Sequence, residues 1–235
     1  MSAITGRDYI IINGVSSDTV GLYIDTPPMP PMQARNFQTV SIPNRPEVLT
    51  MQEITRPDIQ IDISAYLFDD EQSADPSAIY AYLNNAVTLS TSKSEDFEYR
   101  VRRLLGVTPS YQGHGKQLLT ISFICSPYRY STDNDAIELT AFPNSITNGG
   151  NQFCQPVFKL YGTGELTLTV NEDEANKLVI PDVDGYVIAD AEKLICHKNG
   201  TFVRCSGKIP FLAVGDNSIE TNATKIEIIK NERWL

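Results

Sequence analysis

The sequence Ile59-Gln60-Ile61-Asp62-Ile63-Ser64-Ala65-Tyr66-Leu67 alternates aliphatic side chains with more polar ones. Successive side chains of a β-strand point to opposite faces, so this order predicts a half-buried strand with its aliphatic side chains turned to a core. Residues 166–170, with the sequence Leu-Thr-Leu-Thr-Val, repeat the pattern. These stretches predict a fold built mainly from β-sheet.

Further strand-like runs follow one another along the chain, about every 8–15 residues, with turn residues between them, a spacing typical of β-sandwiches and barrels. The predicted strands are Tyr9–Ile12, Val20–Ile24, Glu98–Leu104, Leu118–Cys125, Ala136–Thr140, Val157–Tyr161, Tyr186–Ile188, Phe202–Cys205 and Lys225–Ile229. The fold class predicted is all-β in the main, with two β-sandwich domains.

One helix is predicted among the strands. Asp75 can cap it and Pro76 suits its first position, because that position needs no amide hydrogen-bond partner. An apolar stripe follows at helical spacing, formed by Ile79, Tyr82, Leu83 and Ala86. The stripe either packs on a sheet of the first domain or binds a partner.

The composition changes between Pro127 and Asn151, where residues 130–135 are polar and Gly149-Gly150 marks a turn. This segment predicts a boundary between two domains, residues 1–135 and residues 136–235.

The net charge disfavours nucleic acid as a specific partner. The 235 residues include 19 Lys and Arg against 29 Asp and Glu, so the formal net charge is 19 − 29 = −10. The densest basic cluster, Arg100, Arg102 and Arg103, falls in an alternating strand pattern typical of solvated strand-face charges. No run approaches the ~18 apolar residues of a membrane span, and no Sec signal peptide is predicted.

Four cysteines, Cys125, Cys154, Cys196 and Cys205, are widely spaced and form no Cys-x-x-Cys pair. Zinc sites usually contain close ligand pairs. Cys196 and Cys205 could approach each other across a hairpin beside His197, but reduced, half-buried thiols are the preferred interpretation. No metal and no cofactor are predicted.

No catalytic residue is predicted, and the chain is not expected to be an enzyme. A serine or cysteine nucleophile usually needs a histidine base, and both histidines, His114 and His197, fall in predicted turns. Asn199-Gly200 suits a two-residue hairpin turn. Asp182-Val183-Asp184-Gly185 is interpreted as a second hairpin turn rather than as a calcium loop.

The segment Thr26-Pro27-Pro28-Met29-Pro30-Pro31-Met32 is locally rich in proline. Its prolines hold the chain extended and remove backbone donors. Two interpretations stay open, namely an arm that contacts a neighbouring subunit and a surface loop of the monomer. The candidate subunit-interface residues are Pro28, Met29, Pro31, Met32, Arg45 and His114.

Several motifs occur together in a characteristic order. They are residues 27–31, residues 40–45 (Val-Ser-Ile-Pro-Asn-Arg), residues 121–128 (Ile-Ser-Phe-Ile-Cys-Ser-Pro-Tyr), residues 148–151, Pro156, residues 161–170, residues 207–212, residues 215–219 and Arg233-Trp234. In this order, over nearly the whole chain, they resemble the distal tail protein (Dit) family of long-tailed siphophages. Asn44 and Ala191 depart from the family's usual glycine and serine.

The resemblance implies an N-terminal β-sandwich domain with a proline-rich arm and a C-terminal galectin-like β-sandwich domain. It also implies a hexameric ring, single or double, that joins the tail tube to the baseplate and lets DNA pass. The implied partners are other copies of the chain, the tail tube protein, a tail-associated hub or lysin protein and receptor-binding baseplate proteins. The implied location is the virion tail, assembled in the host cytoplasm.

Two other functions are weighed against this one. The first is a module that binds host-surface saccharide through the galectin-like domain, although Trp234 and His197 provide only part of a galectin-type site. The second is a β-sandwich hydrolase with two acidic residues, for which no pair of carboxylates stands out in the sequence.

Overall fold

A computed structural model describes residues 8–29, 35–43, 46–52, 55–68, 76–111, 116–174 and 177–235. The fold is mainly β, with one α-helix among these residues, which confirms the predicted fold class. The chain divides into two compact units, Met1–Arg129 and Tyr130–Leu235, each described separately below. No helix in the described ranges has both the length and the apolar character that crossing a membrane requires.

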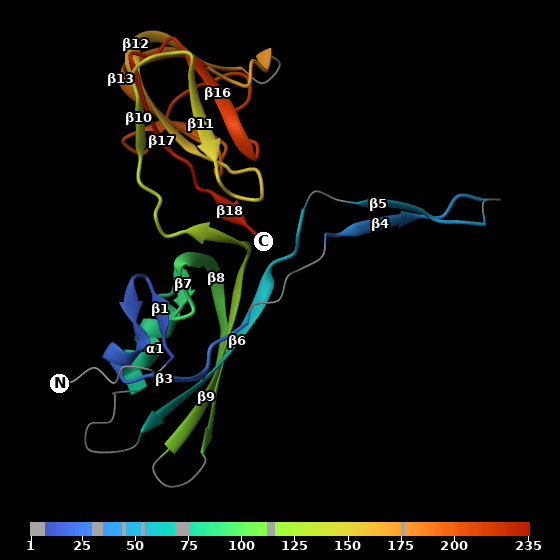
Figure 1. Ribbon diagram of the computed structural model, residues 1–235, viewed down its shortest axis with the longest axis vertical. Coiled ribbons are helices and arrows are strands. Elements are labelled where there is room, and N and C mark those ends of the chain that lie inside the picture. The colour runs from blue at the N-terminus through green and yellow to red at the C-terminus, as the bar shows by residue number, and fades with distance from the viewer. Residues whose placement is uncertain are drawn as a thin grey trace. The chain divides into compact units, whose positions relative to one another are not determined.

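The first unit contains an antiparallel sheet in the order β2-β1-β7-β8-β9-β6-β3 (Figure 1). The alternating stretch forms all of β6 except its last residue, and its aliphatic side chains, from Ile59 to Leu67, are buried, as predicted. The strands are β1 (Ile10–Ile12), β2 (Val15–Ser16), β3 (Tyr23–Thr26), β6 (Ile59–Phe68), β7 (Thr88–Thr91), β8 (Ser94–Tyr111) and β9 (Lys116–Ser131).

The predicted helix is α1 (Pro76–Asn84), with Pro76 at its start. Ile79 and Leu83 are fully buried in the core of the first unit, and the Tyr82 hydroxyl donates a hydrogen bond to the Val15 carbonyl at 2.9 Å. Ala86, the last residue of the predicted stripe, lies beyond the helix, but it still packs against this core. The predicted cap, Asp75, is outside the described residues.

The predicted strand Val20–Ile24 is wrong at its start. A 3₁₀ helix, η1 (Ser17–Val20), comes first and ends at Gly21, whose φ of 76° is readily adopted by glycine. The Gly21 and Leu22 amides donate to the carbonyls of Asp18 and Ser17, so strand β3 begins only at Tyr23.

The second unit contains β10 (Ile137–Leu139), β11 (Asn144–Asn148), β12 (Val157–Val170), β13 (Leu178–Asp190), β14 (Ile195–Lys198), β15 (Thr201–Phe202), β16 (Gly215–Thr221), β17 (Lys225–Ile229) and β18 (Arg233–Trp234). Strand β12 pairs with β13 along one edge. On its other edge it pairs with β17 over residues 157–161 and with β16 over residues 168–170. Strand β12 therefore connects the other strands of one eight-stranded sheet, whose buried side chains form one core.

The predicted hairpin turn at Asp182–Gly185 is wrong, because these residues lie inside β13, opposite residues 162–164 of β12. Gly164 and Gly185 have φ values of 83° and 81°, and the register shifts between Gly164 and Leu166. A bulge of this kind bends a strand and increases its twist. The Asp-Gly pair thus lies inside the paired hairpin, next to its irregular part, and not at its turn.

The predicted turn at Asn199-Gly200 is confirmed. Lys198 pairs with Thr201, and the two residues between them have φ values of 50° and 78°, as a type I′ turn requires. His197 itself belongs to strand β14, so the prediction that it lies in a turn is wrong. The predicted strand Phe202–Cys205 is also too long, because β15 ends at Phe202.

Candidate functional site

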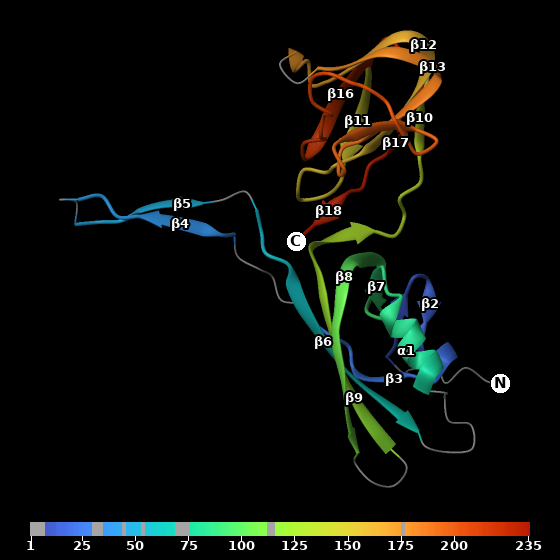
Figure 2. The same cartoon turned by 180° about the vertical axis from the view of Figure 1, so that it is seen from behind.

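A two-stranded hairpin is separate from the main sheet of the first unit. Strand β4 (Phe37–Val40) pairs with β5 (Leu49–Gln52) in the register Phe37↔Gln52 to Val40↔Leu49. No third described strand pairs with either of them, as Figure 2 shows. We call residues 37–52 the arm hairpin.

The arm hairpin exposes apolar side chains without a core beneath them. Its exposed apolar residues are Phe37, Val40, Ile42, Val48, Leu49 and Met51, with exposed fractions from 39% to 57%. None of the six belongs to the hydrophobic core of either unit. In this register Val40, Leu49 and Met51 share one face of the hairpin, and Phe37 lies on the other. An isolated two-stranded hairpin is marginally stable in water, and exposed apolar side chains gathered on one segment are typical of an interaction site.

Only two of the predicted interface residues lie in the described part of the chain. Met29 is 94% exposed at the end of the described proline segment, and Pro28 is half-buried. Pro31, Met32, Arg45 and His114 are outside the described residues, so their role stays a prediction. Sequence reasoning missed the paired strands of the arm hairpin, although Phe37–Val40 and Leu49–Gln52 each have two apolar residues that could have suggested short strands.

The basic cluster is found on strand β8, as its alternating pattern predicts. Arg102 and Arg103 are exposed, and the Arg102 Nε lies 4.0 Å from an Asp58 carboxylate oxygen. These contacts are those of solvated strand-face charges.

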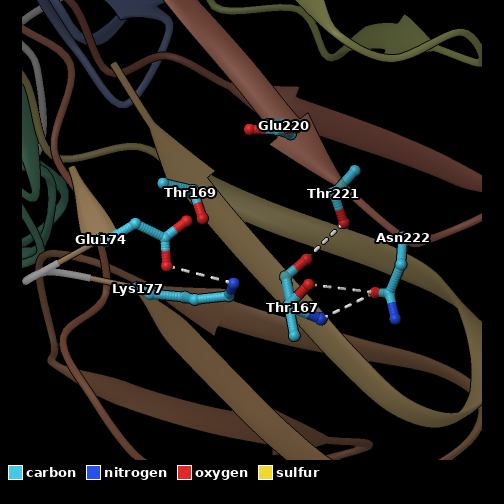
Figure 3. A pocket seen from close by; sticks show the side chains of 7 residues that line it. All are labelled: Thr167, Thr169, Glu174, Lys177, Glu220, Thr221 and Asn222. Carbon is cyan, nitrogen blue, oxygen red and sulfur yellow. Dashed lines mark hydrogen bonds and ion pairs between the residues drawn. The ribbon is translucent and has the colours of Figure 1, made fainter. Parts of the chain in front are cut away.

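In the second unit, a cavity of about 230 Å³ opens on the outer face of β12 (Figure 3). Its walls come from β12, from the residues before β13 and from the end of β16, and every lining residue is polar. The lining residues are Thr167, Thr169, Glu174, Lys177, Glu220, Thr221 and Asn222. We call this cavity the β12 pocket.

Hydrogen bonds between the strands fix two sides of the β12 pocket. On one side, the Thr167 amide donates to the Asn222 side-chain oxygen at 2.8 Å, and the Thr221 hydroxyl donates to the Thr167 carbonyl at 2.6 Å. On the other side, the Lys177 ammonium forms an ion pair with Glu174 at 3.2 Å. The walls of the pocket are therefore held in place before any ligand binds.

Two polar groups of the β12 pocket have no partner among the described residues. Only 4% of Thr169 is exposed, and no described residue forms a hydrogen bond with its hydroxyl, which stays accessible to solvent. Glu220, which pairs with Thr169 across the strands, has an exposed carboxylate that makes no ion pair within the described ranges.

A second polar cluster lies where β12 pairs with β13 and with β17. Glu227 accepts hydrogen bonds from Lys225 and Tyr161, and together with the nearby Lys159 these hold the pKa of its carboxyl at about 2. The Lys159 and Lys225 ammonium groups lie 4.8 and 4.6 Å from the centre of the Tyr161 ring. The Lys159 and Lys198 ammonium groups lie 5.2 and 5.3 Å from the centre of the Tyr186 ring. Each ring therefore has two lysines within cation–π distance.

The thiols lie in or beside the cores, and all four cysteines are free. Burial raises the pKa of Cys125 to about 12, and burial together with a hydrogen bond to Cys205 raises that of Cys196. Cys196 and Cys205 thus lie close together, as the sequence suggested. Among the residues that the structure describes, no group of three or more His, Cys, Asp or Glu side chains could hold a metal ion.

The C-terminal strand is anchored by a buried charge. The Arg233 side chain donates to the Phe153 carbonyl from Nε at 3.0 Å and from Nη2 at 2.7 Å, and from Nη1 to the Gln155 side-chain oxygen at 3.1 Å. It also lies 4.6 Å from the centre of the Phe153 ring. These contacts tie β18 to the segment that precedes β12.

The fold and its surfaces define a class of protein, namely a mainly-β chain of two units, each with its own core, whose first unit carries an exposed hairpin. A solved structure with a similar fold is the SPP1 Dit (gp 19.1) protein, described as a paradigm of the hub adsorption apparatus in Gram-positive infecting phages. This chain is similar to it with a TM-score of 0.74 and 12% sequence identity, over 98% of this chain and 100% of that one. No protein-family model and no curated protein matches the chain. The predicted resemblance to distal tail proteins is thus confirmed at the level of the fold.

Proposed function

We propose that this chain is a structural subunit of a phage tail, and that six copies form a ring that joins the tail tube to the baseplate. The arm hairpin is the observation that carries the proposal, because it presents apolar side chains that no described part of the chain covers. The fold that the chain shares with SPP1 Dit supports the same role.

The partner proposed for the arm hairpin is a neighbouring copy of the same chain. A contact between the arm hairpin and a different surface of the next copy is heterologous, and such contacts close into a ring when the rotation between copies allows it. Burial of the arm's apolar side chains would stabilise the ring by about 25 cal/mol for each Å² removed from water. The same burial would stabilise a hairpin that is marginal alone.

The ring would have an open centre through which DNA passes without sticking. Six copies carry a formal charge of 6 × −10 = −60, which disfavours tight binding to phosphate groups. The other proposed partners are the tail tube protein, a hub or lysin protein and receptor-binding baseplate proteins, all in the virion tail. Both a single ring and two rings face to face are compatible with the proposal.

The test is light scattering on a size-exclusion column, with negative-stain images of the same peak. We expect a species of 6 × 26.1 = 156.6 kDa, or twice that mass, with an open centre. A double variant, Phe37→Thr with Met51→Thr, removes two apolar side chains of the arm hairpin but keeps residues that favour strands, so we expect it to shift the peak toward monomer.

The matched control is Val87→Thr, which changes an exposed apolar side chain of the first unit outside the arm hairpin. It should leave the ring intact. A wild-type chain that stays at 26.1 kDa at high concentration would contradict the ring, and a ring that survives the double variant would contradict the role of the arm.

A further inference from the structure

We propose that the β12 pocket of the second unit binds one uncharged, hydroxyl-rich sugar unit. This goes beyond the structural role of the ring and gives the saccharide-binding alternative a specific site. The proposal rests on the unpartnered polar groups, the charge and the size of the pocket.

The free hydrogen-bonding capacity of Thr169 and Glu220 is the first argument for a ligand. Neither side chain has a hydrogen-bond or ion-pair partner among the described residues, and the two residues lie directly opposite each other across β12 and β16. Thr169 is only 4% exposed, but its hydroxyl stays accessible from the pocket. A ligand hydroxyl between them would accept a hydrogen bond from Thr169 and donate one to Glu220.

The charges of the pocket favour an uncharged ligand. Two carboxylates, Glu174 and Glu220, line it together with one ammonium group, Lys177. An anion would meet the unpaired Glu220, while a metal ion would lie close to the Lys177 ammonium and would have to compete with it for Glu174. A neutral polyol needs both donors and acceptors, and the lining side chains provide an ammonium, an amide, hydroxyls and carboxylates.

The size of the pocket suits a single sugar ring. Its volume of about 230 Å³ equals the share of roughly eight waters at about 30 Å³ each, so a ligand of this kind would replace a small cluster of bound waters. Polar contacts have to carry the binding, because no aromatic side chain lines the pocket. We therefore expect weak binding, with a Kd of about 1 mM.

Saturation-transfer NMR tests the proposal, since it detects weak ligands of a monomer and of a large ring alike. D-Glucose, D-galactose, N-acetylglucosamine and D-mannose are titrated into the full chain to about 10 mM, tenfold above the expected Kd. We expect at least one sugar to receive saturation. The variants Thr169→Val and Glu220→Gln should each weaken its binding about tenfold, because the first removes a hydrogen-bond donor and the second replaces a charged acceptor with a weaker, neutral one.

Thr163→Val is the matched control, because Thr163 is an exposed threonine of the same strand outside the pocket, and it should leave binding unchanged. Thermal unfolding of each variant checks that the second unit stays folded. The proposal is overturned if none of the sugars receives saturation, if both pocket variants bind as the wild type does, or if calcium ions displace the sugar from the pocket.

Discussion

Two hairpins of this chain have apolar residues at strand positions but differ in whether those side chains are buried. Strands β4 and β5 of the arm hairpin pair only with each other, and Phe37 is 57% exposed. Strands β12 and β13 have further strands on their outer edges and a core on one face, and Phe158 of β12 is fully buried. Both hairpins contain apolar residues at strand positions.

The difference shows that a strand pattern predicts pairing but does not say where the apolar side chains will be buried. In the second unit, the partner strands come from the same chain. For the arm hairpin, no other described strand serves as a partner. We infer that the apolar side chains of the arm are retained for a contact between copies, and the predictions that follow test this contrast.

The largest difference is expected between Phe158→Ala and Phe37→Ala. Loss of the buried ring should lower the free energy of unfolding of the second unit by about 3–5 kcal/mol, because the change leaves a cavity in the core. Loss of the exposed ring should change it by less than about 0.5 kcal/mol, as for most surface substitutions. Urea unfolding followed by fluorescence of Trp234, the only tryptophan, measures the second unit.

In an assembly assay the ranking should reverse, with the larger effect expected from Phe37→Ala. Phe37→Ala should weaken the ring on a size-exclusion column, while any folded fraction of Phe158→Ala should still assemble. Equal losses of stability in the two variants would contradict the contrast between the hairpins.

The sequence predicted those parts of the fold that depend on short-range pattern. The alternation of Ile59, Ile61 and Ile63 requires only a core on one side, and Asn199-Gly200 determines its own turn. Asp182–Gly185 was interpreted wrongly because Asp-Gly suits a hairpin turn and a bulge equally well, and the strand that lies opposite, residues 162–164, is far away in the sequence. A local window contains no information about that partner.

The β12 pocket could not be predicted for a related reason. Thr169, Lys177 and Glu220 meet only because β12 pairs with β13 on one edge and with β16 on the other. Each is an ordinary surface-type residue in its own segment, and no motif links them. Arg233 is a similar case, since nothing in the sequence shows that this charge will be buried against the Phe153 carbonyl.

A smaller effect is expected from Arg233→Met compared with Arg103→Met. The Arg233 side chain makes three hydrogen bonds near the start of β12, so its loss leaves the Phe153 carbonyl without that partner and should lower the free energy of unfolding by about 2–3 kcal/mol. Arg103 is exposed on β8, and its substitution should change stability by less than about 0.5 kcal/mol. Trp234 fluorescence in urea again reports the first value. Circular dichroism at the main transition of the first unit reports the second, and a loss near 2 kcal/mol for Arg103→Met would show that exposed strand charges matter as much as buried ones.

The smallest effect is a pH dependence of stability that comes from Glu227, on the polar face that β17 shares with the β12–β13 hairpin. Hydrogen bonds from Lys225 and Tyr161 lower the pKa of Glu227 from 4.5 to about 2. A carboxyl whose pKa is lower in the folded state stabilises the fold fully above its unfolded pKa, and this contribution is lost as the pH falls from about 4.5 to about 2. The wild type should therefore lose more stability than Glu227→Gln between about pH 5 and about pH 3.

Comparison with Glu227→Gln isolates this group, because every other carboxyl titrates in both proteins and the glutamine can still accept the hydrogen bond from Tyr161. The measurement is the midpoint of thermal unfolding, followed by Trp234 fluorescence at several pH values. The difference between the two proteins should shrink at high salt, since Glu227 and its lysines are only half-buried and exposed charges are screened. Parallel pH profiles at low salt would mean that the ion pairs on this face add nothing to the stability of the hairpin, and that its core alone distinguishes it from the arm.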